Sequence, residues 1–325
     1  MIANSLGRGL SLTELGLGGA QIGNLFRAGT DEQADAVVRA AWDAGIRYFD
    51  TAPHYGLGLS ERRLGEALRA YPRDEVVVST KVGRLLEPSD AGDQQDPEGF
   101  HVAATHRRVW DFSREGVLRS IEASLERLGL DRIDLVLIHD PDDHASEALE
   151  AAAPTLSQLR SEGVIGGYGV GMNQAAMLAR FVREADPDVV MVAGRYTLLD
   201  QTAGADLLPV ARDRGVGVIA AGVFNSGLLA RPQPRPDARF DYDIVPGELL
   251  ERTTRLARVC EEFGVDLPTA ALAFAGRHPA VTSVVVGLET PDQVRELVAR
   301  WGRSVPDGLW SALSEEGLMA PFVVS

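Results

Sequence analysis

The chain has 325 residues, of which 45% are hydrophobic and 24% are charged, a balance typical of globular proteins with a substantial core. Its formal net charge of −15 disfavours nucleic acids and anionic membrane surfaces as partners, because their phosphates would be repelled. The single cysteine, Cys260, excludes an internal disulfide and a cysteine-based metal site. Residues 1–30 carry no signal-peptide pattern, and no segment reaches about 18 apolar residues, so we expect a cytoplasmic protein.

Short apolar runs alternate with amphipathic stretches along the chain. The runs that predict strands are Thr13–Leu17, Arg47–Phe49, Val76–Lys81, Ile133–His139, Gly167–Val170, Val189–Ala193, Val216–Ala220 and Ser283–Val286. The stretches that predict helices are Glu32–Ala44, Ser60–Ala70, Arg114–Leu128, Glu147–Glu162, Gln174–Glu184, Ala203–Arg214, Glu248–Phe263 and Pro291–Ala299. These alternations predict an α/β protein in which residues 1–325 form one (β/α)8 TIM barrel domain with long βα loops.

Several features lie outside this repeat. Pro268–Arg277 predicts an additional helix before the last strand, and Asp31 and Asp307 are expected to cap the first and last helices. Residues 82–112 and 221–246 form long connections, which in a compact domain are usually functional. A linker between two domains is the alternative for residues 221–246, although the strand–helix alternation resumes after them.

Four chemically versatile residues lie at the ends of neighbouring predicted strands. Asp50 follows the second strand, Lys81 ends the third, His139 ends the fourth, and Tyr55 lies in the loop after the second. Lys81 is also the only lysine among 32 basic residues. Each residue alone has an ordinary interpretation, such as a turn cap or a buried imidazole. Because barrel enzymes carry their chemistry at the carboxyl ends of the strands, the combination predicts an active site.

This combination suits proton transfer to or from a carbonyl oxygen. A free tyrosine titrates near about 10, and a neighbouring ammonium such as Lys81 is expected to lower the pKa of Tyr55. Asp50 can hold that ammonium in place, whereas an arginine could not act as a compact charge beside a phenol. A neutral His139 is expected to donate a hydrogen bond to the substrate oxygen.

The motifs around these residues resemble those of the aldo-keto reductase superfamily. They are DTAPHYG at residues 50–56 with Ser60 and Glu61, VSTK at 78–81 and DLVLIH at 134–139, and the resemblance covers about residues 10–300. It implies a metal-free (β/α)8 barrel with a nicotinamide cofactor across its mouth. It also implies a tetrad of Asp50, Tyr55, Lys81 and His139, with Tyr55 as the general acid or base. Residues 139–144, 193–200 and 222–227 resemble the branch that contains aldose 1-dehydrogenases and pyridoxal 4-dehydrogenase.

The chain departs from this family at several cofactor positions. Where many members have Ser-Asn, Gln and a stacking Tyr, it has Gly171-Met172-Asn173, Ala193-Gly194 and Ala221-Gly222. We therefore expect the cofactor to contact a set of nearby residues, namely Asn173, Tyr196, Phe224, Asn225, Gly227, Gly287, Glu289 and Gln293. A carboxylate near the adenine ribose favours NAD, and NADP is the alternative because arginines elsewhere can bind its phosphate.

The residues support one leading function and several alternatives. The leading hypothesis is NAD(P)-dependent oxidation of C1 of an aldose, fucose-, galactose- or arabinose-like, to a lactone, with His54 and Trp110 contacting this small-molecule sugar or carbonyl substrate. A reductase of aldehydes or ketones and a pyridoxal 4-dehydrogenase are the nearest alternatives. A barrel that only binds would not need Lys81, and a lyase or glycosidase would favour paired carboxylates. The segment 139–144 is not expected to bind a metal.

Overall fold

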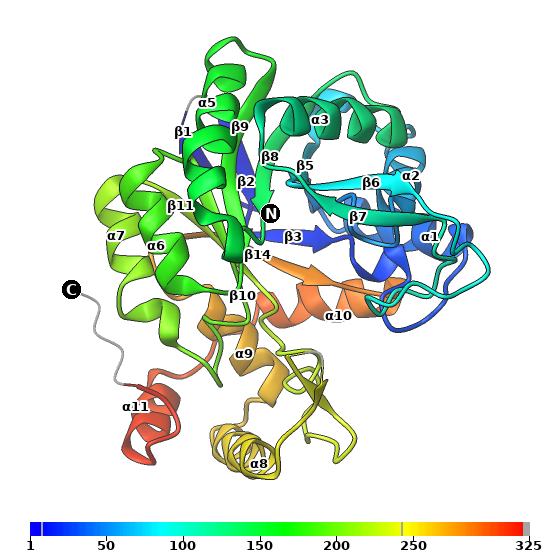
Figure 1. Ribbon diagram of the computed structural model, residues 1–325. Coiled ribbons are helices and arrows are strands. Elements are labelled where there is room, and N and C mark those ends of the chain that lie inside the picture. The colour runs from blue at the N-terminus through cyan, green and yellow to red at the C-terminus, as the bar shows by residue number, and fades with distance from the viewer. Residues whose placement is uncertain (8, 242, 321–325) are drawn as a thin grey trace.

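The computed structural model describes residues 1–7, 9–241 and 243–320 (Figure 1). Eight parallel strands pair in chain order, and the last pairs with the first, so that they close a barrel. These strands are β3 (Leu15–Gly18), β4 (Tyr48–Asp50), β5 (Val77–Val82), β8 (Ile133–His139), β9 (Ile165–Met172), β10 (Val189–Ala193), β11 (Gly217–Ala221) and β14 (Val281–Gly287). The predicted (β/α)8 barrel is confirmed.

Helices surround this barrel (Figure 1). They are α1 (Asp31–Asp43), α2 (Leu59–Leu68), α3 (Arg114–Leu128), α4 (Ala145–Glu147), α5 (Ala153–Ser161), α6 (Ala175–Glu184), α7 (Leu207–Arg214), α8 (Gly247–Glu262), α9 (Leu267–Ala275), α10 (Pro291–Trp301) and α11 (Asp307–Glu315). The helix expected over Glu147–Glu162 is interrupted by a π-helical segment, Ala148–Ala152. The additional helix before the last strand is present as α9.

The two helix caps predicted from aspartates are wrong. Thr30 caps α1: its hydroxyl accepts a hydrogen bond from Gln33 N, and the Gln33 side chain accepts one from Thr30 N. Asp31 is instead the first helical residue, where a carboxylate is stabilised by the helix dipole. α11 begins after Pro306, so Asp307 lies inside its first turn and makes no capping bond.

An N-terminal hairpin, which the sequence did not reveal, precedes the barrel. Its strands are β1 (Ala3–Gly7) and β2 (Leu10–Thr13). Leu12 is fully buried in a cluster with barrel-interior side chains such as Tyr48, Leu135 and Ile219. The Asn4 side chain also donates to Thr282 O, near the start of β14. The hairpin therefore packs against the end of the barrel opposite the carboxyl ends of its strands.

The two long connections both leave carboxyl ends of barrel strands. Residues 82–112 contain an antiparallel ribbon of β6 (Arg84–Pro88) and β7 (His106–Trp110), which follows β5. Residues 221–246 follow β11 and contain a short pair, β12 (Arg239–Phe240) and β13 (Asp243–Ile244). Strands on both sides of residues 221–246 belong to the same closed barrel. Both connections are thus placed to wall the barrel mouth.

Candidate active site

Four polar side chains meet where β4, β5 and β8 end. Lys81 lies at the centre of the group, because its Nζ donates to Asp50 Oδ2 at 2.7 Å, to Thr51 O at 3.0 Å and to Tyr55 Oη at 3.1 Å. Three acceptors match the three hydrogens of an ammonium group. The His139 ring lies edge-on to the Tyr55 ring, with their centroids 5.9 Å apart. The structure therefore brings together the four residues expected from the strand ends.

Burial and charge set the protonation of this group. Burial alone would lower the pKa of Lys81, but the Asp50 carboxylate and the Tyr55 hydroxyl together outweigh burial and raise that pKa above the ordinary lysine value. Burial, reinforced by the positive charges of Arg84 and Lys81, holds the pKa of His139 well below its usual value. Burial and Arg84 also lower the pKa of His54 to about 2. The site thus combines a cationic lysine with neutral imidazoles.

Two side chains inside the barrel, Ser79 and Tyr48, form a hydrogen-bonded series that ends at Asp50. Ser79 Oγ donates to Asp50 Oδ1 at 2.7 Å, and Tyr48 Oη lies 3.0 Å from Ser79 Oγ. Tyr48 and Ser79 are fully buried. Each Asp50 oxygen therefore has its own donor, Ser79 on one side and Lys81 on the other. Ser79 and Tyr48 were not predicted as site residues, although Ser79 lies two positions before Lys81 on the same strand.

A second polar cluster adjoins His139. Arg84, the first residue of β6, donates from Nη2 to Asp140 Oδ2, and its Nη1 lies 3.4 Å from His54 Nδ1. Asp140 Oδ2 is also 3.4 Å from His139 Nε2. Burial raises the pKa of Asp140, whereas the charge of Arg84 acts in the opposite direction. Sequence reasoning missed Arg84 and Asp140, and the available signal was that Asp140 directly follows a strand end.

Two cavities meet at the site, and the side chains of Tyr55 and Asn173 line both. The first has a volume of about 350 Å³ and extends over the ends of β3, β10, β11 and β14. The second has a volume of about 660 Å³ and is walled by the β3–α1 and β5–α3 connections. An extended ligand in the first cavity and a small one in the second would therefore meet beside Tyr55.

The residues of the first cavity fit a nucleotide cofactor. Six of the expected contacts line it, namely Asn173, Phe224, Asn225, Gly227, Gly287 and Glu289. Asn225 is 3% exposed and donates to Gly194 O, while its Oδ1 has no hydrogen-bond partner among the described residues. A buried acceptor without a partner suits a donor on a ligand. Glycines along the same wall, including Gly18 and Gly222, permit close approach of that ligand.

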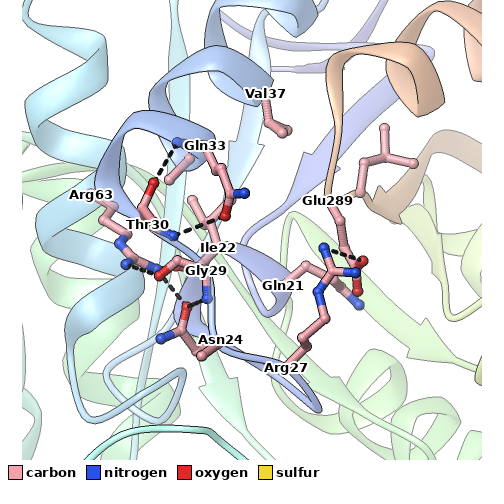
Figure 2. A pocket seen from close by; sticks show the side chains of 13 residues that line it. Gln21, Ile22, Asn24, Arg27, Gly29, Thr30, Gln33, Val37, Arg63 and Glu289 are labelled. Atoms are coloured by element: carbon pink, nitrogen blue, oxygen red, sulfur yellow. Dashed lines mark hydrogen bonds and ion pairs between the residues drawn. The ribbon is translucent and has the colours of Figure 1, made fainter.

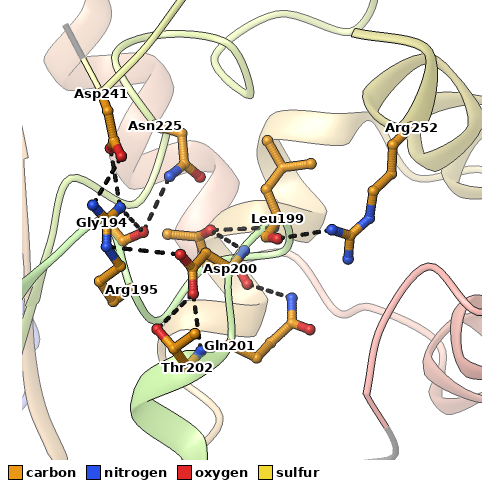
Figure 3. Close-up of polar contacts among 10 residues, drawn as sticks. Gly194, Arg195, Leu199, Asp200, Gln201, Thr202, Asn225, Asp241 and Arg252 are labelled. Atoms are coloured by element: carbon orange, nitrogen blue, oxygen red, sulfur yellow. Dashed lines mark hydrogen bonds and ion pairs between the residues drawn. The ribbon is translucent and has the colours of Figure 1, made fainter. Parts of the chain in front are cut away.

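An ion pair ties the β11–α8 connection to the loop after β10, at the edge of this cavity (Figure 3). Arg195 donates to both carboxylate oxygens of Asp241, at 3.0 and 2.8 Å. Asn225, from the same connection, contacts the adjacent Gly194 O at 3.2 Å. These contacts fix the connection across the carboxyl ends of β10 and β11.

Comparison with known proteins agrees with this geometry. The Aldo/keto reductase family model matches residues 14–314. The chain belongs to this family. It is 50% identical to D-threo-aldose 1-dehydrogenase of Pseudomonas sp over 318 residues, 96% of each chain. It is 42% identical to pyridoxal 4-dehydrogenase of Microbacterium luteolum over 335 residues, 97% of each chain. The solved glycerol dehydrogenase of Gluconobacter oxydans has a TM-score of 0.77 at 24% identity, with 98% and 95% of the two chains covered, which shows likeness of fold.

As an aldo/keto reductase, the chain is an oxidoreductase that uses a nicotinamide cofactor. Across residues 1–7, 9–241 and 243–320, no group of three or more His, Cys, Asp or Glu side chains is arranged to hold a metal ion. In that same part of the chain, every helix is too short or too polar to cross a bilayer.

Three predicted contacts of this aldo/keto reductase lie away from the cavities. Tyr196 is 3% exposed and packs against Phe274, with ring centroids 4.9 Å apart, behind the barrel strands. Gln293 caps α10, because its Oε1 accepts hydrogen bonds from the backbone of Glu289 and Thr290. Trp110 is 45% exposed on β7, with the guanidinium of Arg84 stacked on its ring at 4.4 Å. Trp110 therefore packs on Arg84, which belongs to the second polar cluster beside His139.

Two further residues border Glu289 and were missed from the sequence (Figure 2). Gln21 packs so tightly on Gly287 that a Cβ there would lie 1.7 Å from Gln21 Oε1. Arg27 Nη2 lies 3.5 Å from Glu289 Oε2. Both residues follow β3, the first barrel strand, so the same strand-end rule that found Asp50 could have located them.

Proposed function

We propose that the chain oxidises C1 of an aldose to the corresponding lactone, with fucose-, galactose- and arabinose-like sugars as candidates and NAD as cofactor. The observation that carries the proposal is the buried Lys81 ammonium between the Asp50 carboxylate and the Tyr55 hydroxyl, at the junction of the two cavities. The 50% identity to a D-threo-aldose 1-dehydrogenase supports the choice of substrate.

Each member of the tetrad has a separate role in this reaction. Tyr55 Oη accepts the proton of the C1 hydroxyl, and Lys81, 3.1 Å away, stabilises the negative charge on the phenol that makes it a base. Asp50 holds Lys81, and neutral His139 donates a hydrogen bond to the same substrate oxygen. A nicotinamide cofactor bound in the first cavity, against residues such as Phe224 and Asn225, would supply the acceptor for the hydride of C1. Once the proton leaves the oxygen and the hydride leaves C1, the remaining electron pair forms the carbonyl of the lactone.

The second cavity supports a hydroxylated substrate. Polar side chains of His54, Gln95, His101 and Asp140 line it together with apolar groups such as Phe100. Carboxylates, amides and imidazoles can bind several hydroxyl groups at once, and a ring packs against the apolar wall. Oxidation of pyridoxal is the second candidate, favoured by the 42% identical pyridoxal 4-dehydrogenase. Reduction of an aldehyde or ketone is the same chemistry in the opposite direction.

The charge at the end of the first cavity favours NAD over NADP. Glu289 lines this cavity and its side chain is 35% exposed. A carboxylate accepts hydrogen bonds from ribose hydroxyls and repels a 2′-phosphate. NADP is the alternative because Arg27, 3.5 Å from Glu289, is a cation within reach of such a phosphate. The proposal treats residues 1–325 as one catalytic domain.

A substrate screen tests the proposed function. The purified chain is mixed with a panel of aldoses, pyridoxal and simple alcohols, with NAD or NADP, and reduced nicotinamide is followed by absorbance. We expect the highest kcat/KM for an aldose with NAD, with a lactone as the product, and turnover lowered by at least about 100-fold in Tyr55→Phe. Highest activity with pyridoxal would favour the second candidate. Activity restricted to carbonyl reduction would contradict the proposal.

A further inference from the structure

Asp140 has an unusual backbone conformation directly after the last residue of β8. It directly follows His139 and has a φ of 42°, in the left-handed region that residues other than glycine rarely adopt. Its backbone N–H donates to Gly171 O at 2.9 Å, so the conformation is fixed by the neighbouring strand β9. Strained positions of this kind gather at functional sites. The conformation gives the side chain a place on the wall of the second cavity.

The carboxylate of Asp140 is anchored through one of its two oxygens. Arg84 Nη2 donates to Oδ2, and His139 Nε2 lies 3.4 Å from the same oxygen. Over the part of the chain that the structure describes, we find no hydrogen bond to Oδ1. Arg84 is itself held between the Trp110 ring and His54. The side chain of Asp140 is 29% exposed, which leaves it accessible from the cavity.

We infer that Asp140 determines specificity by accepting a hydrogen bond from the substrate hydroxyl on the carbon next to the reacting carbon. The reacting oxygen is bound between Tyr55 Oη and His139 Nε2 in the proposed function, on which this inference rests. Asp140 lies beside His139 Nε2. Two substrate oxygens on adjacent carbons are separated by about the length of one hydrogen bond. A hydroxyl on the adjacent carbon therefore falls within reach of the carboxylate.

The chemistry of the pair fits this role. A carboxylate only accepts, so it selects hydroxyl donors and leaves an alkyl hydrogen at that carbon without compensation. Arg84 balances the negative charge, so the site carries no net charge that would favour a cationic substrate.

Two substitutions at Asp140 suit the test because both tolerate its backbone. Asparagine and glycine adopt the left-handed conformation more readily than other residues. Asp140→Asn keeps the shape and a neutral acceptor, whereas Asp140→Gly removes the acceptor. Asp143→Asn is the matched control, because it makes the same change in charge at an exposed residue of the same loop. Thermal unfolding of each variant establishes that it is folded.

Paired substrates then report on a single hydroxyl. Each aldose oxidised by the unmodified protein is compared with its 2-deoxy analogue, and kcat/KM is measured for both. We expect Asp140→Gly to lower kcat/KM for the 2-hydroxylated sugar by about 10- to 100-fold, as for loss of a hydrogen bond to a charged group, and Asp140→Asn to lower it less. The 2-deoxy sugar should change by less than about threefold, and Asp143→Asn should affect neither sugar.

The outcomes separate the inference from the proposed function. Equal losses on both sugars, or no loss on either, would overturn the role of Asp140 even if aldoses are oxidised. Failure of the unmodified protein to oxidise any aldose would refute the proposed function instead. The same comparison then uses reduction of lactaldehyde against propanal, which differ by the same hydroxyl. If neither aldehyde is reduced with NADH or NADPH, both the proposed function and the inference fall.

Discussion

The buried side chains of Tyr48, Ser79 and Asp50 are joined by hydrogen bonds. The direction of these bonds predicts how substitutions change the free energy of unfolding. An ionised Asp50 can only accept, so the single hydroxyl hydrogen of Ser79 is used on Asp50 Oδ1 at 2.7 Å. Tyr48 must then donate to Ser79 Oγ, 3.0 Å away. Burial, followed by the negative charge of Asp50, raises the pKa of Tyr48 well above its usual value, so it remains a neutral donor. The direction of both bonds is therefore fixed.

This direction makes the two single substitutions unequal. Ser79→Ala removes a hydrogen bond to a charged group, at a cost of about 1.5–3 kcal/mol, and leaves the buried Tyr48 hydroxyl unpaired for about 1–3 kcal/mol more. Tyr48→Phe removes only one neutral hydrogen bond, at about 0.5–1.5 kcal/mol. In the Ser79→Ala background, however, Tyr48→Phe removes the unpaired hydroxyl. The second substitution should then stabilise the protein by about 1–3 kcal/mol.

A double-mutant cycle measures this change of sign. The free energy of unfolding is compared by denaturant titration for the unmodified protein, the two single variants and the double variant. The same four proteins are assayed for turnover, where Ser79→Ala should lower kcat more than it raises KM because Asp50 no longer holds Lys81 as firmly. Additive free energies, within about 0.5 kcal/mol, would refute the inferred direction of the hydrogen bonds.

Four further predictions concern the tetrad and the cofactor. Tyr55→Phe should lower kcat by about 10²- to 10⁴-fold with nearly unchanged cofactor affinity, measured by fluorescence titration, and near-normal turnover would exclude Tyr55 as the base. Lys81→Arg should be comparably inactive, since a guanidinium cannot satisfy the same three acceptors; an active variant would make the lone lysine dispensable. Because the pKa of His139 is held well below its usual value, the ring stays neutral at neutral pH, and its contribution to stability is lost as pH falls below about 6.5, where the unfolded chain binds the proton. A limb of the pH–rate profile near 6.5 that vanishes in His139→Asn would contradict this. Glu289→Gln should raise the kcat/KM ratio of NADP to NAD by about tenfold, and an unchanged ratio would place the preference elsewhere.

The barrel and the tetrad were predictable because both depend on simple rules of position. Apolar runs bounded by turns located β8 and β10 to the residue, and the helical period located α3 equally well. Parallel strands present their carboxyl ends at one face, so residues far apart in the chain converge there. The same rule predicts that Asp140, Gln21 and Arg27 lie near the site, because they follow barrel strands. They were not predicted as site residues because no chemical role was assigned to them.

Side chains in loops were harder to predict because strand position no longer fixes their direction. Tyr196 lies only three residues beyond β10, but Gly194 between them has a φ of 71° and turns the chain, after which Tyr196 packs behind the strands against Phe274. The sequence contains no periodic pattern that would reveal this turn. Gln293 has a local role for a related reason, since its spacing from Thr290 is that of a capping box, and backbone donors bind its side chain.

Trp110, which was predicted to contact the substrate, is connected to the site through Arg84. The register of the β6–β7 ribbon pairs Arg84 with Trp110, which brings the indole onto the guanidinium and not into the cavity. Arg84 in turn holds Asp140, next to His139. A loss of the Trp110 ring would therefore act on substrate recognition through the position of Arg84. Its effect should be confined to the substrates that need Asp140, because Lys81 donates to Asp50, Thr51 and Tyr55, which all lie outside the ribbon.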